Sequence, residues 1–236
     1  MVNDHQRKRI TGDAHRSNDS PVTAGTSTLL GDQEGHSMEP GGREPAPGPL
    51  RLVQSFINTR DLQTGRDALS GPDALREWLA GQGLLRSDEH VGAAQLRRAW
   101  QLREALRAAM LTNNGEPEDP RTVDTLNELA ARARLGVRFH GDHGDIEPSS
   151  SGVDGAMGWI LSVAIVSMIE GSWYRLKACR RCRWVFYDHS KNRSGTWCSM
   201  ITCGNRIKAD AYRRRRREAR GPHAALRGPV LATGSP

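Results

Sequence analysis

The chain has 236 residues, 36% hydrophobic and 26% charged, with a formal net charge of +7, and this length suits one or two domains. Its longest apolar run, residues 159–169, is too short and too polar to span a bilayer, so no membrane partner is expected. No long apolar stretch follows the basic N-terminus, as a secretory signal requires, and we therefore expect a cytoplasmic protein.

Both ends of the chain lack a folding signal. Residues 1–47 are rich in Gly, Pro, Ser, Thr, Asp and Asn, with Leu29 and Leu30 as an isolated apolar pair. Such a composition cannot bury enough apolar surface to offset the entropy that is lost on ordering. We predict a disordered tail over residues 1–47, whose deletion should leave folding nearly intact, and a flexible tail over residues 221–236.

Helical periodicity predicts a mostly helical domain over residues 48–172. Apolar residues at three- and four-residue steps are typical of amphipathic helices. Four such stretches come first, over residues 50–57, 72–80, about 88–113 and 119–136. Pro72 and Pro120 each fall in a first helical turn, where proline is tolerated, which supports these two starting points.

The second half of this domain changes its period. Val137 and Phe139, followed by the turn residues 141–144 and Ile146, predict a small β-hairpin. A last helix over residues 153–172 has the broad apolar face of a central core helix. Apolar stripes of this kind can line a pocket for a small-molecule effector or form an ordinary core. The core interpretation is favoured, because periodic apolar residues need no ligand to explain them.

The four cysteines of the chain form one pattern, Cys179-x2-Cys182-x15-Cys198-x4-Cys203. A two-residue spacing lets both thiolates of the first pair face one ion from a tight knuckle, and the fifteen residues that follow can form a short hairpin. Trp184, Phe186 and Trp197 would cover the site. Positions five apart diverge by about 140° on a helix, so we expect the third cysteine before a helix and the fourth near its first turn.

This arrangement of knuckle, hairpin and helix predicts a treble-clef-like finger with its basic helix over residues 173–220, holding one structural Zn²⁺ per chain. Disulfide bonds are the competing interpretation, but they need an oxidising compartment for which no signal is found. A redox switch at the first cysteine pair is a further alternative. His189 could replace a cysteine as a ligand, although with four cysteines available it is better interpreted as a surface histidine.

The positive charge of the chain is concentrated around and after the cysteines. Residues 173–220 hold 15 Lys and Arg against 3 Asp and Glu, whereas the rest of the chain holds 19 against 24. A helix that starts beside a zinc site and carries guanidinium groups is suited to contact phosphates and base edges in a groove. The alternative is an arginine-rich tail that frays and binds any polyanion weakly. The candidate contact residues are Asn205, Arg206, Lys208, Arg213, Arg214, Arg215, Arg216, Arg217 and Arg220.

Residues 193–206, together with Lys177-Ala178-Cys179 and Cys182, resemble the CGNR zinc-finger family of bacteria. Upstream, residues 55–59, 74–79 and 102–107 are similar to the ABATE domain that precedes this finger. The resemblance covers about residues 50–217. It implies an α+β fold, in which a mostly helical N-terminal domain with a small β-hairpin precedes a treble-clef-like finger with a basic C-terminal helix. It also implies the four cysteines as zinc ligands, Asn205 and Arg206 as the signature polar pair, and a stress-linked regulator of transcription.

The sequence favours a DNA-binding transcription regulator. Two alternatives stay open at this point, namely an adaptor whose basic finger docks on an acidic partner such as RNA polymerase, and an RNA-binding protein. An enzyme is not expected, because no nucleophile with its base, no phosphate-binding loop and no open metal site stands out. His140 and His143, near Asp142 and Asp145, are interpreted as parts of a polar turn.

Overall fold

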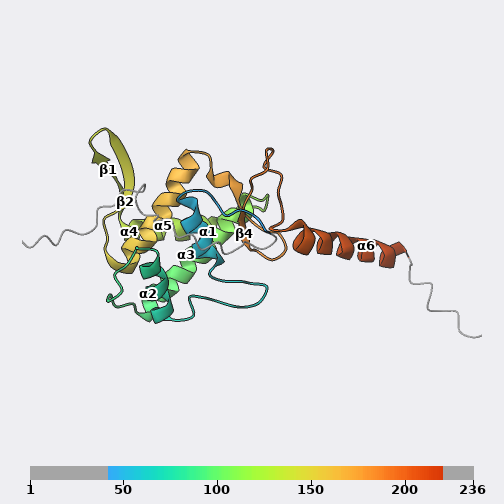
Figure 1. The fold of residues 1–236 in the computed structure, drawn as a ribbon, viewed down its shortest axis with the longest axis horizontal. Coiled ribbons are helices and arrows are strands. Elements are labelled where there is room, and N and C mark those ends of the chain that lie inside the picture. The colour runs from blue at the N-terminus through green and yellow to red at the C-terminus, as the bar shows by residue number, and fades with distance from the viewer. Residues whose placement is uncertain (1–41, 220–236) are drawn as a thin grey trace, which may run out of the picture.

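The computed structural model describes residues 42–219 and consists of a helical body from which one long helix projects (Figure 1). Residues 1–41 and 220–236 lie outside the described residues, and with them most of the two predicted tails and Arg220. The body contains α1 (Leu50–Asn58), α2 (Pro72–Gly81), α3 (Ala93–Thr112), α4 (Pro120–Ala133), β1 (Leu135–His140), β2 (His143–Pro148) and α5 (Gly152–Ile169). After it come η1 (Trp173–Arg175), β3 (Leu176–Ala178), β4 (Val185–Tyr187), the π-helical turn η2 (Met200–Gly204) and α6 (Asn205–Ala219).

The predicted elements of the body are all present, and their ends differ by a few residues. Pro72 and Pro120 open α2 and α4, and the Asp119 carboxylate accepts a hydrogen bond from the Arg121 backbone N–H, as a helix cap does. The third helix begins at Ala93 and not near Asp88. Its start is set by Gly92, whose backbone is extended and whose N–H donates to Oε1 of Gln95 at 3.0 Å. The mostly helical α+β fold is therefore confirmed.

Helix α5 lies at the centre of the body, packed against α1, α3, α4 and β2. Met157, Ile160, Leu161 and Ala164 are buried as the periodicity predicts, whereas Met168 near its end is 38% exposed. Within residues 42–219, α5 is also the single helix long and apolar enough to cross a membrane by length and composition. Because 61% of it is buried inside the protein, it has the character of a core helix.

The strands β1 and β2 form the predicted hairpin, antiparallel and in a register that pairs His140 with His143 across a two-residue turn. One end of the hairpin is fixed to α5 by a close approach at Gly158. A Cβ atom at this glycine would lie 2.6 Å from Cβ of Pro148 and 2.8 Å from Cβ of Ala133. Any larger residue at position 158 would therefore push β2 and the end of α4 away from the core helix.

The strands β3 and β4 do not form a separate module. They pair antiparallel, with Leu176 opposite Tyr187 and Ala178 opposite Val185, and all four of these side chains belong to the same buried core as α1, α3 and α5. At the predicted boundary near residue 172 the chain thus changes from the helical body to the short strands, but both sides of this boundary share one apolar core.

Packing also begins earlier than the predicted start at residue 48. The Ala46 backbone N–H donates to Oε1 of Gln54 on α1 at 2.6 Å, and Nε2 of Gln54 donates to the Val185 carbonyl at 3.3 Å. Residues 42–47, which the composition assigned to a disordered tail, therefore include a segment that is tied to both α1 and β4.

Candidate metal centre and nucleic-acid surface

The four cysteines converge at the end of the body from which α6 leaves. Their sulfur atoms all lie within 4.8 Å of one another, with 3.4 Å between Cys182 and Cys198 and 3.7 Å between Cys198 and Cys203. Sulfurs at the corners of a tetrahedron with Zn–S bonds of about 2.3 Å are roughly 3.8 Å apart. The spacing of the four thiols therefore fits one zinc ion, and no disulfide joins them.

The first cysteine pair occupies the turn between β3 and β4. The Cys179 N–H donates to the Trp184 carbonyl and the Arg183 N–H donates to the Cys179 carbonyl, both at 2.9 Å, and Arg183 takes a left-handed conformation that closes the knuckle. The sequence placed a hairpin after Cys182. The structure instead places the knuckle at the tip of a hairpin whose first strand, β3, precedes it.

The second cysteine pair is held at the start of a helix, as predicted. Cys198 lies just before η2 and Cys203 lies within it, with the Cys203 N–H donating to the Ser199 carbonyl at 3.0 Å. The Ser199 hydroxyl caps this turn by accepting from the Thr202 N–H at 3.2 Å. Five residues in a π-helical turn bring Cys203 back beside Cys198, which an ideal α-helix would not do.

The thiols influence one another's ionisation strongly. Hydrogen bonds from the Cys182 and Cys198 thiols lower the pKa of Cys179, whereas the interaction with Cys179 raises the pKa of Cys182 to about 12 and, more strongly still, the pKa of Cys198. One thiolate is thus stabilised at the expense of its neighbours. A cluster of this kind becomes fully ionised only when a cation neutralises the shared charge, which is the chemistry of a structural zinc site with four cysteine ligands.

Aromatic side chains cover the cysteines. Phe186 is buried with them, and Trp184 and Trp197 pack against the cluster, so the aromatic cover expected from the sequence is confirmed. A residue that the sequence did not suggest completes the cover. The Arg43 guanidinium lies 4.7 Å from the centre of the Phe186 ring and donates to the Trp197 carbonyl at 3.0 Å. His189 is no ligand here, since its Nε2 faces the carbonyls of Glu44 and Pro45.

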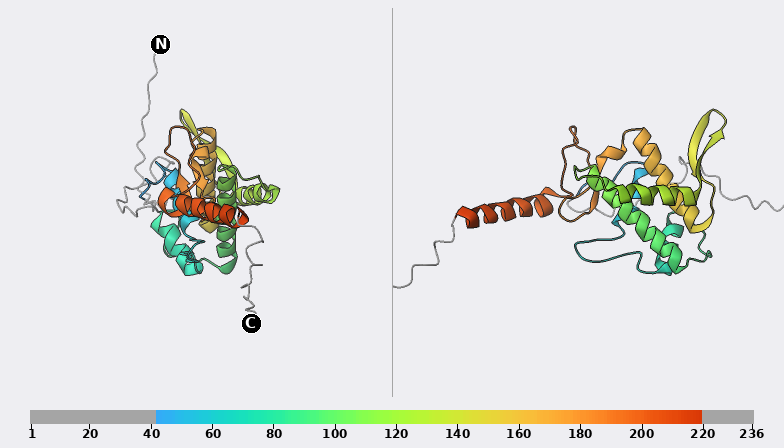
Figure 2. Two further views of the ribbon diagram at one scale, coloured as in Figure 1. Left: turned by 90° about the vertical axis from the view of Figure 1, so that its right-hand side faces the viewer. Right: turned by 180° about the vertical axis from the view of Figure 1, so that it is seen from behind.

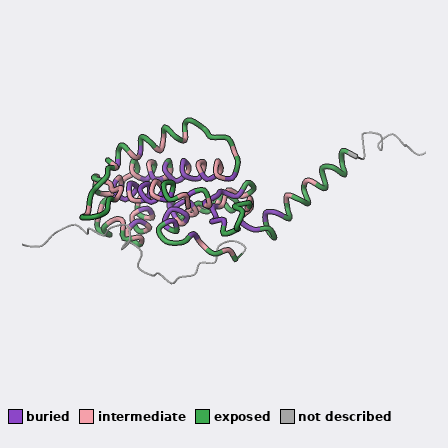
Figure 3. The backbone as a smooth tube through the Cα atoms, turned by 90° about the horizontal axis from the view of Figure 1, so that it is seen from above, coloured by how far each residue is buried: buried purple, intermediate pink, exposed green. Residues whose placement is uncertain are grey.

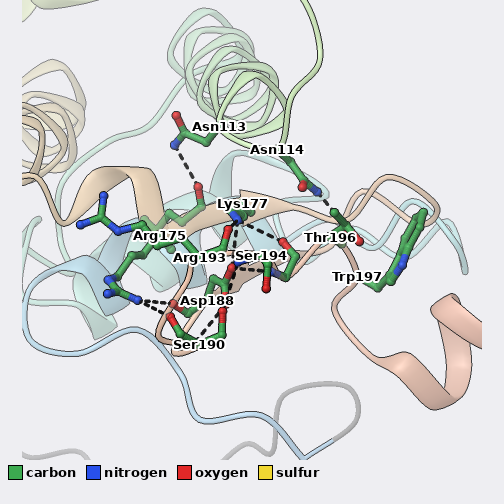
Figure 4. Close-up of polar contacts among 12 residues, drawn as sticks. Asn113, Asn114, Arg175, Lys177, Asp188, Ser190, Arg193, Ser194, Thr196 and Trp197 are labelled. Carbon is green, nitrogen blue, oxygen red and sulfur yellow. Dashed lines mark hydrogen bonds and ion pairs between the residues drawn. The ribbon is translucent and has the colours of Figure 1, made fainter.

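A buried ion pair shapes the loop that leads to the second cysteine pair, residues 188–197 (Figure 4). Lys177 Nζ lies 2.9 Å from Oδ2 of Asp188 and also donates to the Arg193 and Gly195 carbonyls. The Asp188 carboxylate in turn accepts from the N–H groups of Ser190 at 3.1 Å and Gly195 at 2.7 Å. Burial by itself would raise the pKa of Asp188, but these hydrogen bonds outweigh it and lower the pKa to about 2.

The finger is fastened to the end of α3. The Asn113 amide donates to the Trp173 and Leu176 carbonyls, and the Asn114 amide donates to the Ala178 and Thr196 carbonyls at 2.8 and 3.0 Å. The Arg180 guanidinium donates back to the Asn114 carbonyl. The sequence showed these asparagines only as a helix stop, because nothing local reveals that their amides bind a segment far along the chain.

Helix α6 projects from the finger along the long axis of the molecule, and most of its residues are exposed (Figures 1 and 3). At 15 residues it is about 22 Å long. Residues 205–218 are exposed except for Ile207 and Ala211, which are half-buried. The exposed set includes every described member of the predicted contact residues: Asn205, Arg206, Lys208, Arg213, Arg214, Arg215, Arg216 and Arg217.

The structure separates the basic residues around the finger into two groups. Some hold the fold together: Arg175 and Lys177 bind the loop 188–197, while Arg180 and Arg183 bind Asn114 and Glu116 at the end of α3. Arg213 pairs with Asp210 at 2.5 Å. The others are exposed and have no ion pair among the described residues: Arg181, Lys191, Arg193, Arg206, Lys208, Arg214, Arg215, Arg216 and Arg217.

A second group of metal-binding residue types lies on the hairpin. His140, Asp145 and Glu147 offer atoms within 4.8 Å of one another. Glu147 is already engaged there, with Oε1 3.0 Å from Nε2 of His140 and Oε2 3.0 Å from Nε of Arg138. These contacts hold His140 beside Glu147, and Oδ2 of Asp145 lies 3.8 Å from Nε2 of His143, so the group is part of a polar turn.

The comparisons with known proteins agree with this geometry. Residues 50–166 match the ABATE family, described as "Putative stress-induced transcription regulator", and residues 175–216 match the CGNR zinc finger. No curated protein matched the chain. The first match covers the helical body, and the second covers the four cysteines together with most of α6. The chain therefore contains an ABATE domain followed by a CGNR zinc finger.

Proposed function

We propose that the protein is a DNA-binding transcription regulator in which the finger and α6 contact the duplex. The observation that carries this proposal is the placement of α6, a helix that begins at the zinc site and exposes Asn205, Arg206 and Lys208 in its first turn. A helix of about 10–12 Å diameter with cations along its length suits the major groove of B-DNA. The match to a regulator family supports the same conclusion.

Within α6, position relative to the zinc site divides the cations into two roles. Arg206 lies three residues after Cys203, so the metal centre restrains its backbone. Arg214 and Arg216 lie on the outer half of α6. This half projects away from the rest of residues 42–219. Base readout requires a fixed donor, whereas a contact with phosphate carries no sequence information and can also be made by a mobile cation. We therefore assign Arg206 to a base edge and the outer arginines to phosphates.

The test starts with selection of bound duplexes from a random pool, followed by titrations on the selected and on random DNA. Arg206→Ala should weaken binding to the selected site by roughly 1–3 kcal/mol while sparing random DNA. Arg214→Ala with Arg216→Ala should weaken both alike and make the salt dependence shallower by about one unit for each lost phosphate contact. Loss of zinc and of all binding in Arg206→Ala would instead make Arg206 a structural residue.

The body would then act as the regulatory or dimerisation part, without a catalytic role. If this protein binds no duplex at any salt concentration but binds an acidic protein surface, the proposal is overturned and the adaptor alternative is favoured.

A further inference from the structure

The loop 188–197 carries two cations that the fold does not use. Lys191 and Arg193 are exposed, and neither side chain has a hydrogen bond or an ion pair among the described residues. The neighbouring Arg175 and Lys177, in contrast, turn inward and bind backbone carbonyls of the loop. The two free charges are therefore available to a partner.

This loop is held rigidly although it contributes no apolar side chain before Trp197. Lys177 donates to the carbonyls of Arg193 and Gly195, so these carbonyls face inward (Figure 4). Arg193 has a left-handed backbone with φ of 51°, and a Cβ at Gly195 would lie 2.9 Å from the Asp188 carboxylate. Strained backbone conformations persist where the surroundings fix them, and they are frequent at binding sites.

A buried ion pair is a costly way to hold a surface loop. Removing Lys177 and Asp188 from water carries a desolvation penalty, which is offset only by the hydrogen bonds that both groups make to the loop. A segment that merely led the chain to Cys198 would not need a fixed conformation at Lys191 and Arg193. The network gives these two side chains a defined place on the surface.

The loop lies at the same end of the molecule as α6. It rises from the finger there, away from β1 and β2 (Figures 1 and 2). The zinc site joins the two elements, because Cys198 follows the loop directly and Cys203 lies in the turn η2 that leads into α6. One rigid centre thus presents two cationic elements.

We propose that the loop 188–197 is a second contact with the same DNA duplex, in which Lys191 and Arg193 bind backbone phosphates flanking the groove that α6 occupies. This inference rests on the proposed function of α6. Two cationic side chains at a defined place on a polar loop suit phosphate oxygens, and contacts to phosphates fix the register of a protein on DNA without reading its sequence.

The test compares three double variants with the full-length zinc-loaded protein. Lys191→Gln with Arg193→Gln removes the two loop charges, and Lys191→Arg with Arg193→Lys preserves them. Arg97→Gln with Arg132→Gln is the matched control, since both residues are exposed and lie near the start of α3 and the end of α4, remote from the finger. Zinc content and melting temperature are measured for each, with fluorescence anisotropy on selected and random duplexes over a range of salt concentrations.

We expect the loop glutamine variant to flatten the slope of log affinity against log salt by about two units on both duplexes. The control and the charge-preserving variant should have the same slope as the unmodified protein. A loop glutamine variant that behaves as the control does, or a charge-preserving variant that loses binding equally, overturns this inference. Polyglutamate is titrated in the same way as a model of an acidic protein surface. A loop glutamine variant that keeps the salt slope of the unmodified protein on duplexes but no longer binds polyglutamate also overturns this inference. Failure of the unmodified protein to bind any duplex would instead overturn the proposed function itself.

Discussion

At the scale of single residues, the Lys177–Asp188 pair decides the shape of the finger. Both side chains are buried, and each satisfies backbone groups of the loop 188–197 as well as its partner. Asp188→Asn keeps the shape but leaves the Lys177 ammonium buried without a counter-charge. We expect it to cost about 3–5 kcal/mol of unfolding free energy at pH 7, measured by chemical denaturation. Ser194→Ala, an exposed change in the same loop, is the control and should cost little.

The same pair predicts a dependence on pH. Because folding lowers the pKa of Asp188 from 3.8 to about 2, its charge contributes stability that is complete above pH 4 and is lost as the pH falls toward 2. The contribution is about 2 kcal/mol. Acid also strips zinc from its thiolates in both proteins. The difference in unfolding free energy between wild type and Asp188→Asn therefore isolates the contribution of the Asp188 carboxylate. That difference should narrow below pH 4, and a gap that stays constant to pH 2 would contradict the assignment.

The zinc ligands were predictable residue by residue, but the roles of the basic residues were not. Cysteine spacing is a local constraint, so four positions and their ion follow directly from the sequence. Arg180 and Arg181 are adjacent and chemically identical, yet the first binds the Asn114 carbonyl and the second is exposed. Only the tertiary partner distinguishes them. Arg43 was missed for the same reason, because its ring and carbonyl partners are more than 140 residues away.

At the scale of elements, helices and the β1–β2 hairpin could be predicted because their signals are periodic and local. The position of β3 could not be predicted. Three residues are too few to show the alternation of apolar and polar side chains that marks a strand, and the partner strand, β4, lies on the other side of the knuckle. The sequence therefore predicted that the helical domain ends at residue 172, whereas β3 and β4, which follow it, fill part of the core beside α3.

This shared core changes the expected effect of losing zinc. Cys182→Ser removes a ligand, and because structural zinc contributes to folding, the strands on either side of the knuckle should lose their order. Leu176 and Val185 would then leave the main core, and the helical body should be destabilised as well. We expect one cooperative melting transition at a lower temperature, by calorimetry, with chelator-treated wild type as the comparison. Two transitions, the upper one unchanged, would show that the body is independent of the finger.

At the scale of the whole molecule, the segment before α1 links the two halves of the chain. Composition alone predicted that deletion of residues 1–47 would leave folding nearly intact. The structure contradicts this prediction for residues 42–47, because Arg43 covers the Phe186 ring and Ala46 binds Gln54. Deletion of residues 1–41 should leave the melting temperature unchanged, whereas deletion of residues 1–47 should lower it and speed the release of zinc to a chelator. Equal behaviour of the two truncated chains would count against a role for this segment.

Helix α6 gains its order from few contacts within its own chain. Isolated helices shorter than about 12–15 residues are marginal in water, and the consecutive arginines 213–217 repel one another. Its outer turns should therefore exchange between helix and coil, and a polyanion that neutralises the arginines should extend the helical state. Binding would then be coupled to folding. We expect added duplex to increase helicity in far-ultraviolet circular dichroism, and the association enthalpy to become more favourable as the unbound helix melts on warming.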